Sequence, residues 1–441
     1  MQEQIALINL RPVWARVPLA LLALAALYGG WVGVRWGIGN TMAETAPASY
    51  STDPTAAFES AEAATRLAPR DPFTHLMLAR LNQISFEPEA VPRALAEYEQ
   101  AAALAPNDYM VWMEAGRARA ALGDTEAGVA ALRRAAELAP NYTYPRWHLG
   151  NALLRAGRTD EAFAELRRAA DLDSTLRPQV FNLAWQVYGP DLSRVVDAVG
   201  KTAESRAQLV TVLAGRGNLE EAQGVWAGLG PEGQRVQGGT ADALARALYA
   251  KGQYRRALAI LSEGGYGGLA VGQFHDGGFE SEIAPAGRAL FGWNVTQGGG
   301  QVAIDAARGA HGGRRSLRVA FNASGQVDFR NVWQVVAVEP GARYRLSFFV
   351  KTEELRSAAT LSLMVSEPAT PDTSLGATAP LAQGTQDWQP VSFEFTTGPK
   401  TEAVLVRIVR VYCAEGVCPI YGKIWYDDFN FERIGGRAAA R

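Results

Sequence analysis

The side chains best suited to catalysis are spread along this chain without a catalytic pattern. The four histidines stand far apart, with neither zinc-ligand nor catalytic-triad spacing: His75, His148, His275 and His311. No glycine-rich loop closes with Lys-Ser or Lys-Thr after a strand, so no nucleotide-phosphate site is indicated. The carboxylates of the C-terminal half fall in turns and termini and offer no obvious pair for glycoside hydrolysis. We therefore expect a protein that is not an enzyme.

The two cysteines, Cys413 and Cys418, enclose a short loop between stretches of strand-like sequence. A zinc site would need four ligands, and neither a histidine nor a second cysteine pair lies nearby. Two thiols at this spacing suit a disulfide that closes the loop in an oxidising compartment.

Composition places the chain among multidomain proteins that do not bind nucleic acid. Its 441 residues leave room for two or three domains, and 43 Lys+Arg nearly balance 45 Asp+Glu. No region is basic enough to suggest a nucleic-acid partner. Abundant Ala and Gly, with Arg far more frequent than Lys, are typical of a GC-rich bacterial genome.

Residues 1–39 contain a candidate membrane anchor at about residues 17–36. Val17 to Val34 is uncharged and nearly all apolar, and roughly 18–20 such residues at ~1.5 Å each span a bilayer core of ~30 Å. A buried soluble helix and a cleaved signal peptide are the alternatives. The apolar core of a signal peptide is usually about 7–15 residues long, and the nearest cleavage-like triplet, Ala46-Pro47-Ala48, lies far downstream and contains a proline.

Arginines set the expected orientation of this anchor. Arg11 and Arg16 precede the apolar stretch and Arg35 follows it, so the N-terminus should stay in the cytoplasm. We expect a single-pass protein of the bacterial inner membrane with its bulk in the periplasm. Residues 40–54, rich in Thr, Ala, Ser and Pro, resemble a linker.

The clearest repeat lies between Pro106 and Pro140. Two similar phrases end at Pro106-Asn107 and Pro140-Asn141, 34 residues apart. Between them lie a bulky residue, a small pair, a turn glycine and a small-large-small set: Trp112, Ala115-Gly116, Gly123, Gly128, Leu132 and Ala135. This spacing resembles the tetratricopeptide (TPR) helix–turn–helix unit. The resemblance implies a scaffold with a groove for protein partners and without chemistry of its own.

The repeat phase continues on both sides, and we expect a TPR-like helical solenoid over residues 55–263. The next unit forwards shows Trp147, Leu149-Gly150, Gly157, Ala162, Leu166 and Ala169. Backwards, one unit is lengthened by about three residues around Ser85–Pro92, and before it Ala57 to Pro69 resembles a lone second helix. Beyond Asp173 the phase weakens, but further helices are indicated at Phe181–Tyr188, Arg206–Gly215, Leu219–Leu229, Ala241–Tyr249 and Ala257–Leu261.

The recurring tryptophans of this region are expected to pack in its core. The face of the first helices offers Tyr109, Glu114 and Arg146 as candidates for a partner peptide, but we assign no ligand to it.

A β-sandwich is predicted over residues 274–434, after a glycine-rich linker at 264–273 and before a short tail at 435–441. Here helical periodicity stops, and short alternating runs follow one another between turn residues. The clearest runs are Ser316–Phe321, Val332–Val338, Tyr344–Val350, Thr360–Val365, Val391–Thr396, Ala403–Val411 and Lys423–Glu432. Six to nine strands without helices are typical of an antiparallel sandwich such as a jelly roll.

The order of several short motifs also resembles the jelly-roll carbohydrate-binding modules of the family 4/9 type, within the galactose-binding-like superfold. These motifs are Gly277-Gly278-Phe279-Glu280, Gly292-Trp293, Gly312–Val319, Gln334, Val338–Tyr344, Asp387-Trp388 and Ile424–Phe429. The resemblance implies a structural calcium held by Glu280, Asp427 and Asp428. The alternative is that these carboxylates only accept hydrogen bonds from turn amides. Calcium takes six to eight oxygens, so backbone carbonyls would have to complete the site.

Sugar binding in such a module would need exposed aromatic rings that stack on pyranose faces. The candidates that alternate with expected core positions are Phe329, Trp333, Tyr412 and Trp425. Trp293 and Trp388 match positions of the motif that are usually packed, so we expect both in the core.

The sequence as a whole predicts a membrane-anchored periplasmic adaptor that brings protein partners to envelope or extracellular polysaccharide. Two other functions remain open. The protein could be an assembly factor that binds only proteins, with a purely structural sandwich. It could also be a glycan-processing enzyme, although no carboxylate pair supports that alternative.

Overall fold

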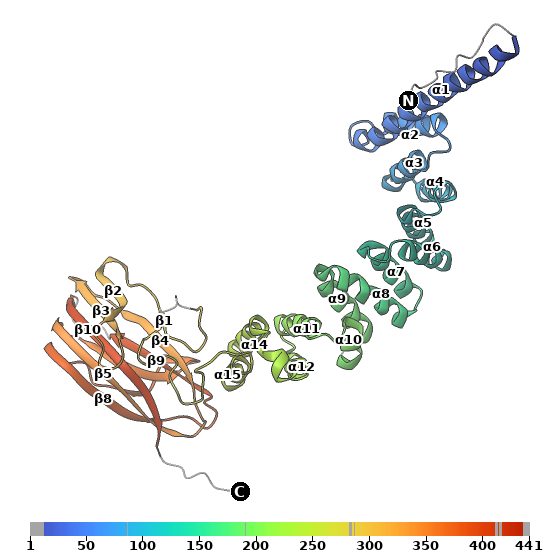
Figure 1. Cartoon of the computed structure of the whole chain (residues 1–441). Helices are drawn as coiled ribbons and strands as arrows, with labels where there is room; N and C mark the ends of the chain where they lie inside the picture. The colour runs from blue at the N-terminus through green and yellow to red at the C-terminus, as the bar shows by residue number, and fades with distance from the viewer. Residues whose placement is uncertain are drawn as a thin grey trace, which may run out of the picture. The chain divides into compact units, whose positions relative to one another are not determined.

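A computed structural model describes residues 13–85, 87–189, 191–281, 285, 287–410, 413 and 417–434 (Figure 1). The predicted architecture is confirmed: a long apolar helix, a TPR-like helical stretch and an antiparallel two-sheet β-sandwich. The chain forms two compact units, residues 1–201 and 202–441.

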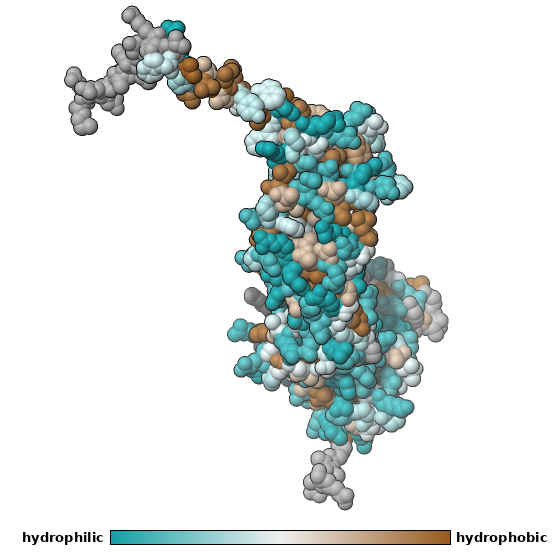
Figure 2. Space-filling model, turned by 90° about the vertical axis from the view of Figure 1, so that its right-hand side faces the viewer, coloured by the Kyte–Doolittle hydropathy of each residue, from teal (hydrophilic) through white to brown (hydrophobic). Residues whose placement is uncertain are grey.

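The first unit begins with α1 (Val13–Ser49), a helix of 37 residues. Exposed hydrophobic residues follow one another along the part of α1 that no other helix covers, from Trp14 to Ile38 (Figure 2). Within the segment Arg16–Ser49, the most apolar stretch of 18 residues has a mean hydropathy of 1.9, and none of that stretch is buried. The helix is therefore long and apolar enough to cross a membrane. A signal sequence near an N-terminus can also meet these criteria of length and composition.

The C-terminal part of α1 belongs to the first helical repeat. Ala43 and Ala46 are fully buried against residues of α2 (Pro54–Leu67) and α3 (Pro72–Ile84). This corrects two expectations: residues 40–49 are helix rather than linker, and α2 is not a lone second helix, because α1 is its partner. The small side chains permit this contact, since a Cβ on Gly39 would lie only 3.2 Å from the Ala64 carbonyl oxygen.

The rest of the first unit is a succession of antiparallel helix pairs. After α3 these helices are α4 (Ala90–Leu104), α5 (Tyr109–Ala121), α6 (Thr125–Leu138), α7 (Thr143–Arg155), α8 (Thr159–Leu172), η1 (Ser174–Leu176), α9 (Arg177–Tyr188) and α10 (Leu192–Val199). Aspartates cap several of them; Asp108 and Asp124, for example, accept the N–H of Met110 and Ala127.

Glycine allows the close helix crossing in the two clearest repeats of the sequence, α5–α6 and α7–α8. A Cβ on Gly116 would lie 2.7 Å from Leu132 Cγ, and one on Gly150 would lie 2.6 Å from Leu166 Cγ. The same two leucines are fully buried. Only a residue without a side chain lets α5 reach α6, and α7 reach α8, at this distance.

The second unit combines the last helices with the sandwich. Its helices are α11 (Ala203–Arg216), α12 (Leu219–Ala227), α13 (Gly230–Arg235), α14 (Gly238–Ala250) and α15 (Tyr254–Glu263). Trp226 is fully buried among them, and its indole N–H donates to Glu263 at 2.7 Å.

The sandwich contains two five-stranded antiparallel sheets. Sheet A has the order β1-β4-β9-β6-β7, formed by β1 (Asn294–Val295), β4 (Phe329–Ala337), β9 (Ala403–Arg410), β6 (Leu361–Glu367) and β7 (Thr370–Ala377). Sheet B has the order β2-β3-β10-β5-β8, formed by β2 (Val302–Arg308), β3 (Arg315–Ala323), β10 (Ile420–Arg433), β5 (Arg343–Arg356) and β8 (Gly384–Thr396). The alternating inward residues of both sheets form one core.

Trp293 lies in this core, as expected, and its ring stacks on Phe279 at 4.8 Å. Its indole N–H donates to the Asp276 carbonyl oxygen at 3.0 Å, which satisfies the only polar atom of the side chain.

The helical hairpin α14–α15 is held against the sandwich. Arg255 of α15 donates to Glu339 at 3.1 Å through its guanidinium and to Glu402 at 3.3 Å through its backbone N–H. Arg246 of α14 donates to the carbonyl oxygens of Gly287 and Arg288 at 3.2 and 2.8 Å. The residues between α15 and the sandwich therefore connect two parts that are already in contact.

Candidate ligand-binding face of the β-sandwich

The outer face of sheet A carries a row of side chains suited to ligand binding. Strand register places Trp333 of β4 opposite Arg407 of β9, and Arg407 opposite Met364 of β6. Their neighbours Val332 and Ile408 belong to the sandwich core, so the row lies on the other face. Trp333 and Met364 are half-buried, and each offers an apolar surface beside a cation.

Charged partners fix the polar end of this row. Arg407 donates to the Pro371 carbonyl oxygen at 2.7 Å and to Asp372 at 3.2 Å. Arg330 also binds Asp372, and hydrogen bonds from Arg330 and then Arg407 lower the pKa of that carboxyl. An ionised carboxylate and a planar guanidinium are thus held beside an aromatic ring, which is a combination that can orient hydroxyl groups on an apolar surface.

Phe329 is a correction to the sequence prediction. Its side chain is fully buried in the core and makes an edge contact with Phe321 at 5.3 Å. The pairing of β4 with β9 has an irregularity between Phe329 and Val332, so the alternation that would put Phe329 on the face of Trp333 is interrupted. Tyr412, the third candidate, lies outside the described residues.

Trp425 and Trp388 lie on the outer side of sheet B. Trp425 of β10 is half-buried and opposes Lys351 of β5 on one side and Arg318 of β3 on the other. Trp388 is also half-buried and outside the core, which corrects the expectation that it packs inside. The structure therefore does not bring Trp333 and Trp425 together, because they belong to opposite sheets.

The three predicted metal ligands converge on one junction near Gly278. Glu280 Oε1 accepts the backbone N–H of Arg314 and Arg315 at 2.7 and 3.0 Å, and these bonds lower its pKa. Asp427 is fully buried and accepts the N–H of His311 at 2.7 Å, while burial raises the pKa of its carboxyl. Asp428 Oδ2 lies 2.7 Å from His311 Nδ1.

Few oxygens of this donor set are free for a calcium ion. Calcium requires six to eight oxygens, whereas both oxygens of Asp427 and one of Glu280 already accept backbone N–H groups. Within the described ranges, no three His, Cys, Asp or Glu side chains are placed to hold a metal ion. The observed geometry is that of the turn-amide alternative, and calcium at this junction stays a prediction.

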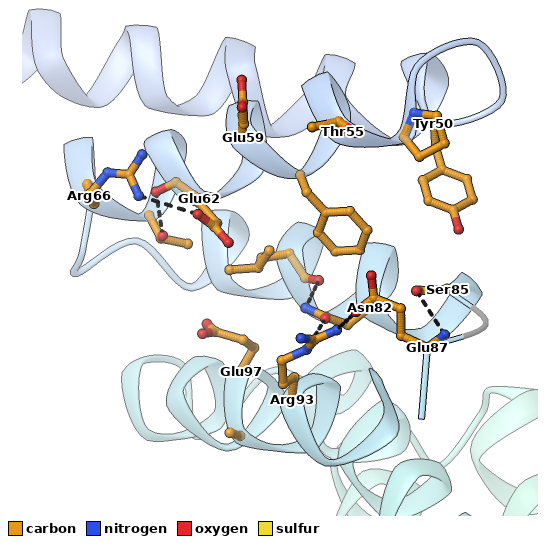
Figure 3. A pocket seen from close by; sticks show the side chains of 15 residues that line it. Tyr50, Thr55, Glu59, Glu62, Arg66, Asn82, Ser85, Glu87, Arg93 and Glu97 are labelled. Atoms are coloured by element: carbon orange, nitrogen blue, oxygen red, sulfur yellow. Dashed lines mark hydrogen bonds and ion pairs between the residues drawn. The ribbon is translucent and has the colours of Figure 1, made fainter. Parts of the chain in front are cut away.

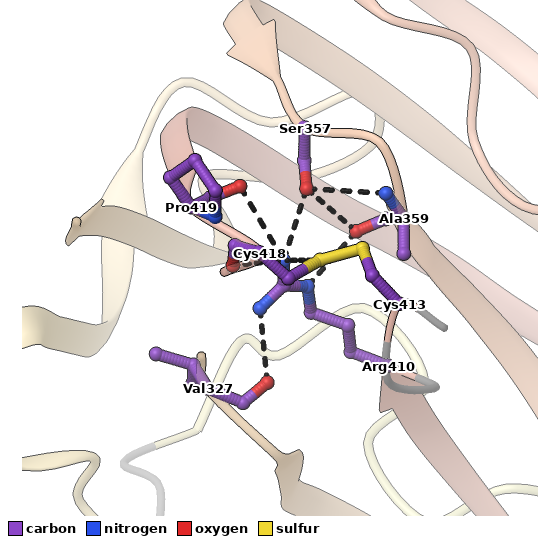
Figure 4. Close-up of a disulfide and its surroundings, with 7 residues drawn as sticks. All are labelled: Val327, Ser357, Ala359, Arg410, Cys413, Cys418 and Pro419. Atoms are coloured by element: carbon purple, nitrogen blue, oxygen red, sulfur yellow. Dashed lines mark hydrogen bonds between the residues drawn. A yellow bond between two sulfur atoms is a disulfide. The ribbon is translucent and has the colours of Figure 1, made fainter. Parts of the chain in front are cut away.

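A disulfide joins Cys413 and Cys418, whose Cα atoms are 5.8 Å apart (Figure 4). Beside it Arg410 is buried, and its guanidinium donates to the carbonyl oxygens of Val327, Ala359 and Cys418 at 2.9–3.0 Å. Burial lowers the pKa of this guanidinium. Arg410 thus ties the disulfide loop to two neighbouring segments of the sandwich.

Sequence reasoning missed Arg407, Asp372 and Met364. Arg407 had a visible signal, because it interrupts an otherwise apolar strand at an outward position of the alternation. Asp372 had none, since its strand β7 has no regular pattern.

The residues considered in the TPR groove are engaged within the chain. Glu114 is buried and binds Arg117 at 2.7 Å, and Arg146 binds Glu165 at 2.8 Å. Tyr109 contacts the ring of Tyr142 at 5.0 Å.

Two regions of the chain match models of known protein families. Residues 271–410 match the family model described as a carbohydrate binding domain, and residues 111–142 match the tetratricopeptide repeat model. No curated protein matches the chain.

Several solved structures are similar to separate regions. A structure described as "CBM4 structure and function" is 19% identical over 36% of this chain and 99% of its own, with a TM-score of 0.28. MamA from Desulfovibrio magneticus RS-1 is 15% identical over 36% of this chain and 90% of its own, with a TM-score of 0.32. PilF from Pseudomonas aeruginosa is 17% identical over 44% of this chain and 91% of its own, with a TM-score of 0.34.

Proposed function

We propose that this protein is a membrane-anchored, non-catalytic adaptor that binds polysaccharide through sheet A and protein partners through its TPR repeats, in the assembly or export of bacterial envelope polysaccharide. The observation that carries the glycan half is the row of Trp333, Arg407 and Met364 with Asp372 beside it. It lies in a domain that matches a carbohydrate-binding family.

The packing of α1 supports an uncleaved anchor. Cleavage near Ala46-Pro47-Ala48 would remove the helix that covers α2 and α3, together with the buried Ala43. It would also remove the hydrogen bond from the Trp36 indole to Asp71, which caps α3. A single-pass span with the repeats in the periplasm keeps these contacts and allows the disulfide to form.

Affinity electrophoresis or pull-down of the full chain with a panel of envelope polysaccharides, with and without calcium, tests the glycan half. We expect retention by at least one acidic or neutral polysaccharide and its loss in Trp333→Ala. Removing a stacking ring costs about 1.5–3 kcal/mol, or roughly tenfold or more in affinity.

Trp425→Ala is the matched control, because it removes a half-buried tryptophan from the opposite sheet. Equal losses in both variants would overturn the assignment of glycan binding to sheet A. No retention of the wild type in any condition would leave an assembly factor that binds only proteins. A reporter that is active only in the periplasm, fused after residue 441, tests the topology, and an inactive fusion would overturn it.

A further inference from the structure

A groove with a volume of about 880 Å³ lies between α2 and α4, the second helices of the first two repeats (Figure 3). We call it the α2–α4 groove. Its floor includes Leu78 and Asn82 of α3, and its walls include Phe58 of α2 and Ala96 of α4. It is therefore a different surface from the face of the first helices, where the sequence suggested partner binding.

One part of the α2–α4 groove is apolar and aromatic. The rings of Tyr50 and Phe58 meet edge to face at 6.1 Å, and both line the groove. Leu78 is buried below them, and Ala96 is exposed on the opposite wall. This part can bury the aliphatic portion of a long side chain.

The rim of the groove is acidic. Four carboxylates line it against two guanidinium groups: Glu59, Glu62, Glu87 and Glu97 against Arg66 and Arg93. Both arginines already have groove carboxylates as partners, since Arg66 lies 3.6 Å from Glu62 and Arg93 binds Glu87. Glu62 and Glu97 extend into the space between the helices (Figure 3).

The extended turn noted in the sequence builds one end of this rim. Five residues, 85–89, separate α3 from α4, whereas three, 122–124, separate α5 from α6. Glu87 belongs to the longer turn, and its backbone N–H donates to Ser85 Oγ at 3.3 Å. The longer turn thus adds Ser85 and Glu87 to the lining of the groove.

We propose that the α2–α4 groove binds a basic segment of a partner protein. Charge decides the occupant, because the groove carboxylates outnumber the groove guanidinium groups by two, or by one when His75 beside Glu97 is protonated. This negative surplus repels anionic lipid headgroups and acidic peptides and attracts lysine or arginine. The wall formed by α2 has 14 residues, which at ~1.5 Å each gives ~21 Å, or about six residues of extended chain. This inference deepens the scaffold half of the proposed function and is independent of glycan binding.

The test uses the full chain in detergent micelles and a fluorescent twelve-residue peptide with arginine at every third position and leucine or alanine elsewhere. We expect saturable binding that weakens as salt is raised, and at least tenfold weaker binding of the same peptide with glutamate in place of arginine. We also expect at least tenfold weaker binding to the double variant Glu59→Lys/Glu62→Lys.

A close structural match for Glu62 provides the control. Glu137 of α6 also lies 3.6 Å from an arginine of its own helix, and its side chain is 59% exposed against 57% for Glu62. Glu137→Lys should therefore leave peptide binding unchanged. Ala96→Arg should block the groove, whereas Ala103→Arg, at an exposed position of α4 outside the groove, should not.

Equal binding of the arginine and glutamate peptides would overturn the proposal, as would unchanged binding by both the charge-reversal and the Ala96→Arg variants. Trp333→Ala separates the two proposals, because it should abolish polysaccharide retention and leave peptide binding intact.

Discussion

Two histidines in the helical repeats have pKa values displaced in opposite directions. His75 Nδ1 lies 2.6 Å from Glu97, and this hydrogen bond raises the pKa of the imidazole despite partial burial. His148 is half-buried near Arg117 and Arg155, and this partial burial, with smaller contributions from the two cations, lowers its pKa to about 4. The folded repeats therefore favour the charged form of one histidine and the neutral form of the other.

These displacements predict how acid affects stability. An unfolded histidine has a pKa of about 6.5. The depressed pKa of His148 stabilises the fold above about pH 6.5, and this contribution is lost as pH falls toward about 4. We expect His148→Gln to flatten the decrease in the unfolding midpoint between pH 6.5 and pH 4.5, measured by circular dichroism.

His75→Gln is the opposite case. The raised pKa of the His75 imidazole stabilises the wild-type fold below about pH 6.5, and this contribution is lost as pH rises through the pKa of the folded state. This variant should change the pH dependence on the alkaline side only. Identical pH profiles for both variants and the wild type would contradict the assigned directions.

At the scale of elements, the α5–α6 and α7–α8 pairs each depend on a glycine at their crossing, Gly116 and Gly150. A Cβ on Gly150 would lie 2.6 Å from Leu166 Cγ, 2.8 Å from its Cδ2 and 3.1 Å from the Ala162 carbonyl oxygen. The leucine is fully buried and the carbonyl belongs to a helix, so neither can move aside freely.

We expect Gly150→Ala to lower the free energy of unfolding by about 1–3 kcal/mol, because overpacking outweighs the better helix propensity of alanine. Gly224→Ala in α12 is the control. A Cβ there would meet nothing within 4 Å, so alanine should be neutral or stabilising by up to about 1 kcal/mol. Urea unfolding measures both, and equal effects of the two substitutions would exclude close helix contact at Gly150.

The helices and strands were predicted from the sequence more accurately than the faces on which their side chains lie. Prolines and glycines at a fixed interval identified the repeats, and alternation identified most strands. Side-chain faces were predicted less well, because one extra residue in a strand reverses them. Four residues of β8, Gln386 to Gln389, lie opposite three residues of β5, Val350 to Thr352, which helps explain why Trp388 lies outside the core. The second role of α1 was hidden because its apolar sequence carries no repeat signature beyond small residues such as Gly39 and Ala43.

At the scale of the whole molecule, the helical hairpin and the sandwich of the second unit are joined by specific contacts. Arg255 reaches Glu339, which follows β4, and Glu402, which precedes β9. These are the strands that carry Trp333 and Arg407. Tyr249 of α14 adds an edge contact with Phe291 at 5.5 Å.

Arg255→Glu should loosen this attachment by placing like charges together. We expect faster cleavage within residues 264–273 in limited proteolysis, because the connecting segment then opens more often. Arg256→Glu is the control, since Arg256 binds Gln223 within the helices instead. Equal cleavage rates in wild type and Arg255→Glu would show that other contacts hold the hairpin in place.

The continuity of α1 has a consequence for how the bilayer presents the repeats. The proposed span and the first repeat share one helix, and Arg35 of this helix donates to the Arg66 carbonyl oxygen of α2 at 3.1 Å. Because the helix is continuous between them, the rotation of the span about its own axis fixes the direction in the membrane plane toward which the α2–α4 groove opens. One residue inserted after Val34 would turn that direction by ~100°. An insertion close to a whole number of turns, at about 3.6 residues each, would restore it. Access of a membrane-bound partner to the groove would therefore depend on the direction that the groove faces as well as on its charge.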